Sequence, residues 1–446
     1  MAPEPILVEG EVEANANPVK KPGSIPILVV DDEPINQQVL KNHLSGQGFD
    51  LTQAMNGEEA ISILEGGQRF DLVLLDIMMP RISGYEVCRR IREKFLPSEL
   101  PVIMVTAKNQ VPDLVEGLTL GANDYLAKPF SKEEFLARVK TQLELHRINA
   151  ATGKFVPNEF LRAIGRERIT EVALGDHKER EVTILFCDIR DYTTLAETMT
   201  PEENYLFVNA CNRRMGPVIR KHHGFINQYL GDAIMAVFPE SPEDAIKAAI
   251  EIQEAMRQYN IQRRAQNHQL IKMGIGLHTG PLVMGIIGDD QRMDAATIAD
   301  TVNVASRVEG LTKYYGANIL VSEASVNWEI GNGEPVAESL PNPRFSLRFL
   351  GQVQVKGKKE AIGVYECFGG DDPAILAKKE ETLEQFQLGL KYFFDKKFEQ
   401  AAGIFEKILE LNHEDATVRL FLKKTAVYFT QGVPEGWTGV ERMEMK

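Results

Sequence analysis

Two aspartates in the middle of the sequence each follow a strand-like apolar segment. Asp188 comes shortly after VTILF, and Asp232 lies 44 residues later, in a Gly231-Asp232 pair between FINQYL and AIMAVF. Because such a pair between apolar segments predicts a tight β-hairpin, both carboxylates would lie at strand ends. Mg²⁺ and Mn²⁺ prefer hard oxygen ligands and keep open positions for phosphate oxygens. The pair therefore indicates a metal site for a nucleoside triphosphate, although an aspartate beside a glycine is, by itself, more often a turn residue.

A second set of polar residues follows the apolar segments nearer the N-terminus. Asp31 and Asp32 come after ILVV, Asp76 after LVLL, Thr106 after VIMV and Lys128 after DYLA. Continuous apolar strands separated by helix-length segments predict a doubly wound α/β fold, whose ligands bind at the carboxyl ends of a parallel sheet. Three carboxylates there would repel one another unless a cation lies among them, and the hydroxyl and ammonium suit a phosphoryl group. Solvated loop residues are the alternative interpretation.

The segment 25–145 resembles a two-component receiver domain, which has a flavodoxin-like fold. Its functional positions are filled here by Asp31, Asp32, Asp76, Thr106 and Lys128. The resemblance implies that Asp76 accepts a phosphoryl group from a cognate histidine kinase and that the three aspartates hold one Mg²⁺. It also implies that the threonine and the lysine contact the phosphoryl group. Tyr125 matches the aromatic switch position, and Lys128-Pro129 matches a loop that usually contains a cis peptide bond.

The last helix of this segment is expected to extend beyond the domain. It begins at Ser131, with Glu134 in capping-box spacing, and continues without proline or glycine up to Gly153. Its first half has the apolar pattern of a helix packed on its own sheet. We therefore expect residues 146–178 to form a connector helix and linker able to pass a shift in the receiver to the next domain.

Three sequence motifs dominate the following region: FCDIRDYTTL, YLGDAIMAVF and TIADTVNVASRVEGLTK. In this order and spacing they resemble the class III nucleotide cyclase catalytic domain, over residues 155–368. The domain itself is expected at 179–370. The expected fold is α+β with a mainly antiparallel sheet, because helix-length segments alternate with a hairpin and with strand-rich IKMGIGLHTGPLVMGIIG.

The resemblance assigns a role to each matching residue. Asp188 and Asp232 would hold two Mg²⁺ or Mn²⁺ ions. Asn303 would orient the ribose and Arg307 would stabilise the transition state; being four residues apart, they share one face of a helix. Lys356 would contact the terminal phosphates. The resemblance also implies that the metal residues of one subunit face the other three residues of its partner, so that the enzyme is active only as a homodimer.

Two positions depart from the family pattern. Members selective for ATP carry lysine where this chain has Gln228, and aspartate or threonine where it has Ala296. Thr297 is adjacent, but neighbouring side chains of a strand point to opposite faces, so it is not an obvious substitute. A glutamine amide can pair with adenine or guanine, and a site without a second fixed partner discriminates poorly. We therefore expect cyclisation with a blunted purine preference.

The C-terminal segment, residues 371–446, is expected to be a short all-α tail. Gly389, Tyr392, Ala401 and Phe405 have the spacings of a tetratricopeptide repeat. Since one repeat cannot bury its own apolar face, the tail must pack on a following helix or on the cyclase domain. It would act as a structural cap or bind a protein partner.

Composition limits the classes of partner. The formal net charge of −14 argues against a broad nucleic-acid interface. No segment approaches the roughly 20 apolar residues that span a bilayer, so we expect no membrane association. Residues 1–24 lack the pattern of a signal peptide and are expected to be a disordered leader. Four scattered cysteines without a CxxC pair fit reduced thiols in the cytoplasm.

The leading interpretation is a response regulator whose phosphorylation controls conversion of ATP to cyclic AMP. One alternative is a guanylate cyclase or a cyclase of low base selectivity. The other is a catalytically idle cyclase-like domain that serves as a dimerising output. The sequence leaves open the direction in which phosphorylation acts, the kinase, and the role of the tail.

Overall fold

The computed structural model describes residues 24–107, 111–327, 345–354 and 360–442. The chain divides into two compact units, Met1–Phe155 and Val156–Lys446. Most of the leader expected over residues 1–24 lies outside the described residues, and so does Lys356.

The first unit is built on a five-stranded parallel sheet with the order β2-β1-β3-β4-β5. Its strands are β1 (Ile25–Val30), β2 (Phe49–Ala54), β3 (Leu72–Leu75), β4 (Val102–Thr106) and β5 (Asp124–Ala127). All four residues of β3 and all five of β4 are buried. Burial on both faces explains why these strands are continuously apolar rather than alternating.

Five helices cover the two faces of this sheet. They are α1 (Pro34–Leu44), α2 (Gly57–Glu65), α3 (Gly84–Lys94), α4 (Val111–Thr119) and α5 (Lys132–Thr152). Apolar residues of α1 and α5 share one core with the sheet, and those of α2 and α3 share the other. The predicted doubly wound receiver fold is therefore confirmed.

Helix α5 has two different halves. Ser131 caps it by accepting a hydrogen bond from the backbone N–H of Glu134. Phe135, Val139 and Leu143 are buried in the first half, whereas Leu145 and Ile148 in the second half are about half exposed (49% and 51%). The helix thus continues beyond the apolar surface that its own sheet offers.

The second unit contains a nine-stranded sheet with the order β14-β12-β13-β11-β9-β6-β8-β7, and β10 pairs with β9 outside this path. Its strands are β6 (His177–Ile189), β7 (Phe225–Leu230), β8 (Ala233–Phe238), β9 (Met273–Gly288), β10 (Met293–Ile298), β11 (Ile319–Ser322), β12 (Leu347–Gln354), β13 (Ile362–Cys367) and β14 (Glu441–Arg442). The pairs β9–β11 and β12–β14 are parallel and the others are antiparallel. The expected mainly antiparallel sheet is thus confirmed.

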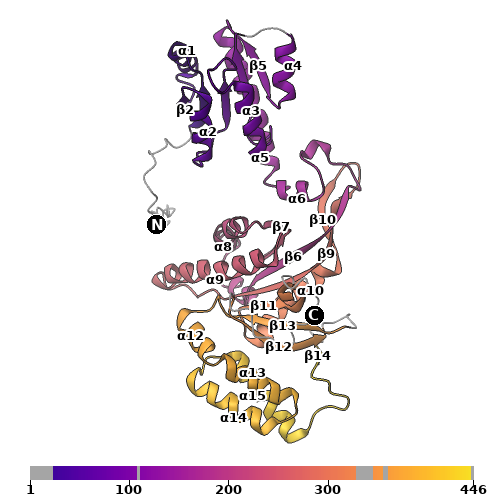
Figure 1. Ribbon diagram of the computed structural model, residues 1–446. Helices are drawn as coiled ribbons and strands as arrows, with labels where there is room; N and C mark the ends of the chain where they lie inside the picture. The colour runs from indigo at the N-terminus through magenta and orange to yellow at the C-terminus, as the bar shows by residue number, and fades with distance from the viewer. Residues whose placement is uncertain (1–23, 108–110, 328–344, 355–359, 443–446) are drawn as a thin grey trace. The chain divides into compact units, whose positions relative to one another are not determined.

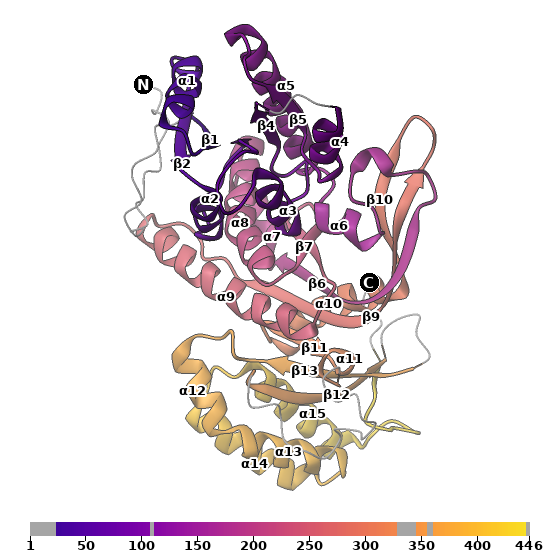
Figure 2. The same cartoon turned by 45° about the horizontal axis from the view of Figure 1, so that its top comes forward.

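Helices cover both faces of this second sheet. The helices of this unit are α6 (Asn158–Ala163), the 3-10 turn η1 (Ile169–Glu171), α7 (Tyr192–Ala196), α8 (Pro201–Lys221), α9 (Pro242–Ala265), α10 (Asp300–Tyr315), α11 (Glu323–Val326), α12 (Pro373–Glu381), α13 (Leu383–Phe394), α14 (Phe398–Leu411) and α15 (Ala416–Gln431). Figures 1 and 2 show α8 and α9 side by side and α12–α15 next to β12 and β13. Helices α8 and α9 share a core with the β6–β8 region, while α10 shares one with the tail helices. The Thr200 capping box at the start of α8 has both of its hydrogen bonds.

The C-terminal tail is helical, as expected, and packs on the nine-stranded sheet. A Cβ at Gly389 would lie 2.7 Å from the Phe405 ring, so only glycine lets α13 and α14 approach this closely. The assignment of a tetratricopeptide repeat stays a prediction.

All four cysteines are buried and free. Across the described ranges, no helix combines the length and the apolar character that crossing a membrane requires.

Candidate functional sites

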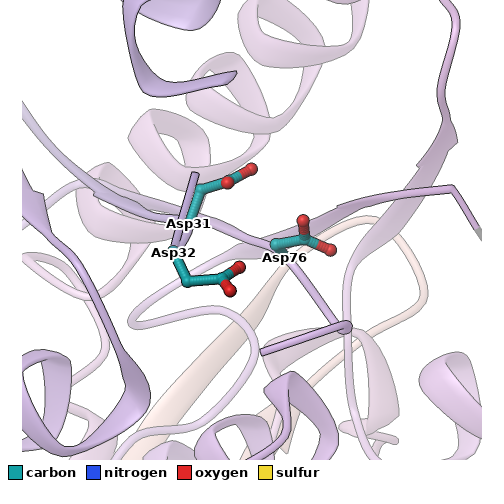
Figure 3. Close-up of side chains that lie close together, drawn as sticks. All are labelled: Asp31, Asp32 and Asp76. Carbon is teal, nitrogen blue, oxygen red and sulfur yellow. The ribbon is translucent and has the colours of Figure 1, made fainter. Parts of the chain in front are cut away.

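The first candidate site is a cluster of three carboxylates at the carboxyl edge of the parallel sheet. Asp31 and Asp32 follow β1, Asp76 follows β3, and one carboxylate oxygen of each lies within 4.8 Å of the others (Figure 3). Asp31 and Asp76 are buried, at 1% and 6% exposure. The backbone N–H groups of Glu33 and Met78 donate to Asp31 and Asp76 at 2.9 and 3.1 Å. These bonds fix the carboxylates close together despite their mutual repulsion.

Lys128 reaches into the same cluster. Its ammonium group donates to Asp31 Oδ2 at 2.7 Å and to Asp76 Oδ2 at 2.8 Å. Burial alone would lower the pKa of Lys128, but the hydrogen bonds with the two aspartates raise it. Burial raises the pKa of Asp31 in spite of the lysine. One ammonium among three carboxylates leaves surplus negative charge, so the oxygen donors fit a divalent cation.

The remaining receiver positions surround this cluster. Thr106 ends β4, is fully buried, and its carbonyl oxygen accepts a hydrogen bond from the Lys128 N–H at 2.8 Å. Tyr125 lies in β5 and its ring is buried in the core. The Lys128-Pro129 peptide bond is cis, as the resemblance implied. The structure therefore brings Asp31, Asp32, Asp76 and Lys128 together at one edge, with Thr106 one strand away.

The second candidate site begins with Asp188, at the end of β6, and Asp232, in the β7–β8 turn. Gly231 has φ of +70°, the left-handed conformation that this tight turn requires. The pKa of Asp232 is raised to about 7, first by burial and then by a hydrogen bond with Asp188 and its charge. The Ile189 N–H donates to Asp188 Oδ1 at 2.8 Å. The two carboxylates thus share one spot, where a divalent cation would relieve their repulsion.

A third carboxylate near this pair escaped the sequence interpretation. Glu309 on α10 has a pKa raised to about 7, first by burial and then by the charge of Asp188. The Glu309 side chain has room at this position because the residues of β9 that face it are glycines. A Cβ at Gly276 would lie 2.1 Å from the Glu309 backbone nitrogen, and one at Gly274 would lie 2.5 Å from its carboxylate. The repeated glycines of MGIG were the available signal.

Arg190 also escaped the sequence interpretation, although it stands only two residues after Asp188. Its guanidinium donates to the Thr312 carbonyl oxygen at 3.2 Å and, more closely, to that of Ala317. Burial lowers the pKa of Arg190, while the charge of Glu309 opposes that shift. The loop after Asp188 is thereby attached to the C-terminal end of α10.

Asn303 and Arg307 lie one helical turn apart on α10, as predicted. Asn303 is exposed and Arg307 is half-buried, while their neighbours Val304 and Val308 are buried in the core. Among the described residues of a single chain, no hydrogen bond or ion pair joins either residue to Asp188. Within one chain, the described side-chain contacts therefore do not link these two residues to that aspartate.

The expected base-reading residues lie on neighbouring edges. Gln228 is exposed on β7, whereas Ala296 and Thr297 are half-buried on β10. The Asn227 amide donates to the Thr297 hydroxyl at 3.3 Å. Asn227 occupies an irregularity in the β7–β8 pairing, which places it beside Gln228 without a cross-strand partner of its own. Thr297 thus lies close to the glutamine strand, and its role in base selection stays a prediction.

An open cavity of about 690 Å³ lies beside the turn that carries Asp232. Its wall combines one face of α8 with Tyr229 and Gly231 of the hairpin, and includes Arg213 and Arg220. Guanidinium groups favour phosphate and carboxylate partners.

Two protein families match separate parts of the chain. Residues 27–140 match the response regulator receiver domain. Residues 175–366 match the adenylate and guanylate cyclase catalytic domain.

Individual relatives likewise include a cyclase and a response regulator. An adenylate cyclase of Anabaena cylindrica is 44% identical over 220 residues, which is 48% of this chain and 42% of the relative. The uncharacterized transcriptional regulatory protein YkoG of Bacillus subtilis is 43% identical over 159 residues, 35% of this chain and 67% of the relative. The solved structure of a bacterial light-regulated adenylyl cyclase is 22% identical, with a TM-score of 0.44, over 59% of this chain and 73% of that one. The chain spans less than half the length of the adenylate cyclases it matches.

Proposed function

We propose that this chain, which belongs to the response regulator receiver family and carries an adenylate and guanylate cyclase catalytic domain, forms cyclic AMP under the control of receiver phosphorylation. One observation carries the catalytic part of the proposal. Asp188 and Asp232 come from different strand ends and lie close together, and burial, followed by the neighbouring Asp188 carboxylate, raises the pKa of Asp232 to about 7. Because the fold holds two carboxylates next to each other, a divalent cation bound between them would neutralise their repulsion.

In the proposed reaction the ribose 3′-oxygen of ATP attacks the α-phosphorus and pyrophosphate leaves. Two bound Mg²⁺ or Mn²⁺ ions would supply a lower pKa for the attacking hydroxyl and charge neutralisation for the leaving phosphates. Asp188 and Asp232 would hold the ions. Arg307 would direct its guanidinium at the negative charge that develops on the α-phosphate, and Asn303 would orient the ribose.

We place this reaction at the interface of a two-fold homodimer. Among the described residues, no hydrogen bond or ion pair joins Asn303 or Arg307 to the aspartate pair within one chain, and both are at least partly exposed on α10. In a two-fold dimer, each aspartate pair would face the α10 residues of the partner, giving two equivalent sites.

ATP is the proposed substrate because the relatives matched over the catalytic region include adenylate cyclases. The second candidate is a guanylate or low-selectivity cyclase. It is favoured by Gln228 and Ala296, since an exposed amide and a methyl group offer no fixed base partner.

The proposed control begins at Asp76. A phosphoryl group there would add oxygens that Lys128, already bonded to Asp76 at 2.8 Å, and Thr106 can contact. These contacts would pull one loop inward and change the face of the receiver that ends in α5. A cognate histidine kinase would supply the phosphoryl group.

The test is turnover by the purified full chain with Mn²⁺ or Mg²⁺ and ATP. We expect cyclic AMP, and we expect Asp232→Asn to abolish it while the exposed Glu410→Gln control on α14 retains it. Activity with and without a small phosphodonor, repeated on Asp76→Ala, tests the control. Absence of any cyclic nucleotide with either metal and all four nucleoside triphosphates would favour an idle output domain instead.

A further inference from the structure

The last turn of α10 is held from two directions. On one side Arg190, two residues after Asp188, donates to the carbonyl oxygens of Thr312 and Ala317. On the other side the C-terminal tail makes two hydrogen bonds: the Tyr314 hydroxyl donates to Glu441 Oε1 at 2.7 Å, and the Thr417 hydroxyl donates to the Tyr315 carbonyl oxygen at 3.0 Å. The last turn of α10 therefore connects the segment after β6, which carries Asp188, to the C-terminal tail.

Packing makes this junction rigid. Val304 and Val308, the immediate neighbours of Asn303 and Arg307, belong to the same hydrophobic core as residues of α13, α14 and α15. At the end of α10, Gly316 has φ of +70°, and a Cβ there would lie 2.4 Å from the Cβ of Ala416. The start of α15 thus abuts the end of α10 without space for a side chain between them.

Buried charges fix the start of α15 on the sheet. Arg348 of β12 is fully buried and makes hydrogen bonds of 2.8 Å from two guanidinium nitrogens to Asp415, the N-cap residue of α15. It also bonds Glu366 of β13 at 2.7 Å, and Lys379 of α12 bonds Glu366 and Asp371 at 2.6 Å each. Because each buried charge has partners of opposite sign, this part of the tail has little freedom to move.

Glu441 completes the junction from the end of the tail. Its strand β14 pairs with β12 at Val353, its carboxylate forms an ion pair with Lys424 of α15, and it is only 28% exposed. Burial and then Glu441 raise the pKa of Tyr314, so the phenol remains a protonated donor at neutral pH. One carboxylate therefore links β12, α15 and α10.

We propose that Glu441 and Thr417 are positioning residues of the nucleotide site: by fixing the last turn of α10, the tail sets where Asn303 and Arg307 stand in that site. The inference rests on the proposed function in one respect, that Asn303 and Arg307 act on the nucleotide. A helix moves as a rigid body over a few turns, so a displaced last turn displaces both residues. Misplacement of about 1 Å in a catalytic group can reduce turnover by up to about a hundredfold.

The test uses hydroxyl deletions that preserve shape. Tyr314→Phe and Thr417→Val should each lower kcat about tenfold with little change in KM, because Arg307 is proposed to act mainly in the transition state. Tyr314→Phe should have no further effect in a Glu441→Ala background, since the hydroxyl acts through that carboxylate. The matched control is Thr430→Val, which removes an α15 hydroxyl that bonds only within its own helix.

Two results would overturn the proposal. One is a kcat of Tyr314→Phe and Thr417→Val that equals that of Thr430→Val. The other is a loss that disappears when turnover is measured well below the unfolding temperature, because that would reflect stability alone. Amide hydrogen exchange supplies a readout that needs no turnover. Exchange should become faster at residues 312–317 and 188–192 in Tyr314→Phe and Thr417→Val but not in Thr430→Val, and unchanged exchange would also contradict the proposal.

Discussion

Asp188 and Asp232 lie beside each other although 44 residues separate them, because Cys187 at the end of β6 pairs with Ile234 at the start of β8. Burial and the neighbouring charge raise the pKa of Asp232 to about 7. Without a cation, the pair therefore holds a proton near neutral pH. A divalent ion would replace that proton, and this competition can be measured without turnover.

The stability of the metal-free protein should reflect this shared proton. The folded-state pKa of Asp232 is about 7 and its ordinary value is 3.8, so the folded state binds the proton more tightly than the unfolded state. The stabilisation is complete below about pH 4, is lost as pH rises through 7, and changes little above that. With a chelator present, Asp232→Asn should reduce the decline of the unfolding temperature across this window. Identical pH dependence in the variant would contradict the assignment.

Divalent cations should stabilise the second unit through the same pair. Because a ligand that binds only the folded state shifts unfolding by mass action, Mg²⁺ or Mn²⁺ at about a hundred times its dissociation constant should add about 2.7 kcal/mol. Thermal unfolding with increasing metal measures the effect. Asp188→Asn and Asp232→Asn should each remove most of it, while Glu410→Gln should not. The Asp76→Asn background removes the contribution of the receiver cluster.

Base preference should be weak in the wild type and adjustable at two positions. We expect less than about a hundredfold discrimination between ATP and GTP, because no fixed polar partner stands at Ala296 and the Gln228 amide can pair with either purine. The combination Gln228→Lys with Ala296→Thr should shift the ratio of kcat/KM values toward ATP. Turnover of each nucleoside triphosphate gives the ratio. The Thr297→Val variant shows whether the existing threonine next to Ala296 already affects this ratio. If the ratio in the double variant equals that of the wild type, Gln228 and Ala296 do not select the base.

Phosphorylation should occur at Asp76 and should require the carboxylate cluster. A small phosphodonor with Mg²⁺ should label the wild type, and Asp76→Asn should abolish labelling. Asp50→Asn is the matched control, because Asp50 lies in β2 near the opposite end of the sheet. Intact-protein mass spectrometry in acidic solution detects the added phosphoryl group. Equal labelling of Asp76→Asn would place the acceptor elsewhere.

Removing Arg348 should destabilise the second unit strongly. The substitution Arg348→Met leaves Asp415 buried without its cation and leaves Glu366 with Lys379 alone, which costs about 3–5 kcal/mol. Lys221→Met breaks an ion pair in which the lysine is 64% exposed, so it should cost no more than about 1 kcal/mol. Urea unfolding measures both. A separate early transition of the tail in the wild type would show that the tail and the sheet do not unfold together.

Local sequence patterns were sufficient for the fold and for the positions of most candidate residues. The apolar strands with Asp31, Asp76 and Lys128 at their ends placed the receiver cluster correctly, because parallel strands deliver their last residues to one edge. The Gly231-Asp232 hairpin followed from turn chemistry. The spacing of Asn303 and Arg307 placed them on one turn of a helix.

Long-range contacts accounted for what the sequence did not reveal. Glu309 reaches the vicinity of Asp188 only because Gly274 and Gly276 let α10 approach β9, and the repeated glycines of MGIG do not by themselves show which helix approaches them. The association of the tail with the sheet depends on Arg348 meeting Asp415, 67 residues later. Charged residues ordinarily indicate solvent exposure, so nothing nearby in the sequence marked them as buried.

The family match ends at residue 366, in the middle of the buried charge network. A recombination event that transplanted only the matched region would strand the Glu366 carboxylate without Lys379 and the Arg348 guanidinium without Asp415. A cut directly after the matched region would therefore leave buried charges without their partners of opposite sign. The part of the chain that keeps this charge network complete extends past residue 366 at least to Asp415 at the start of α15.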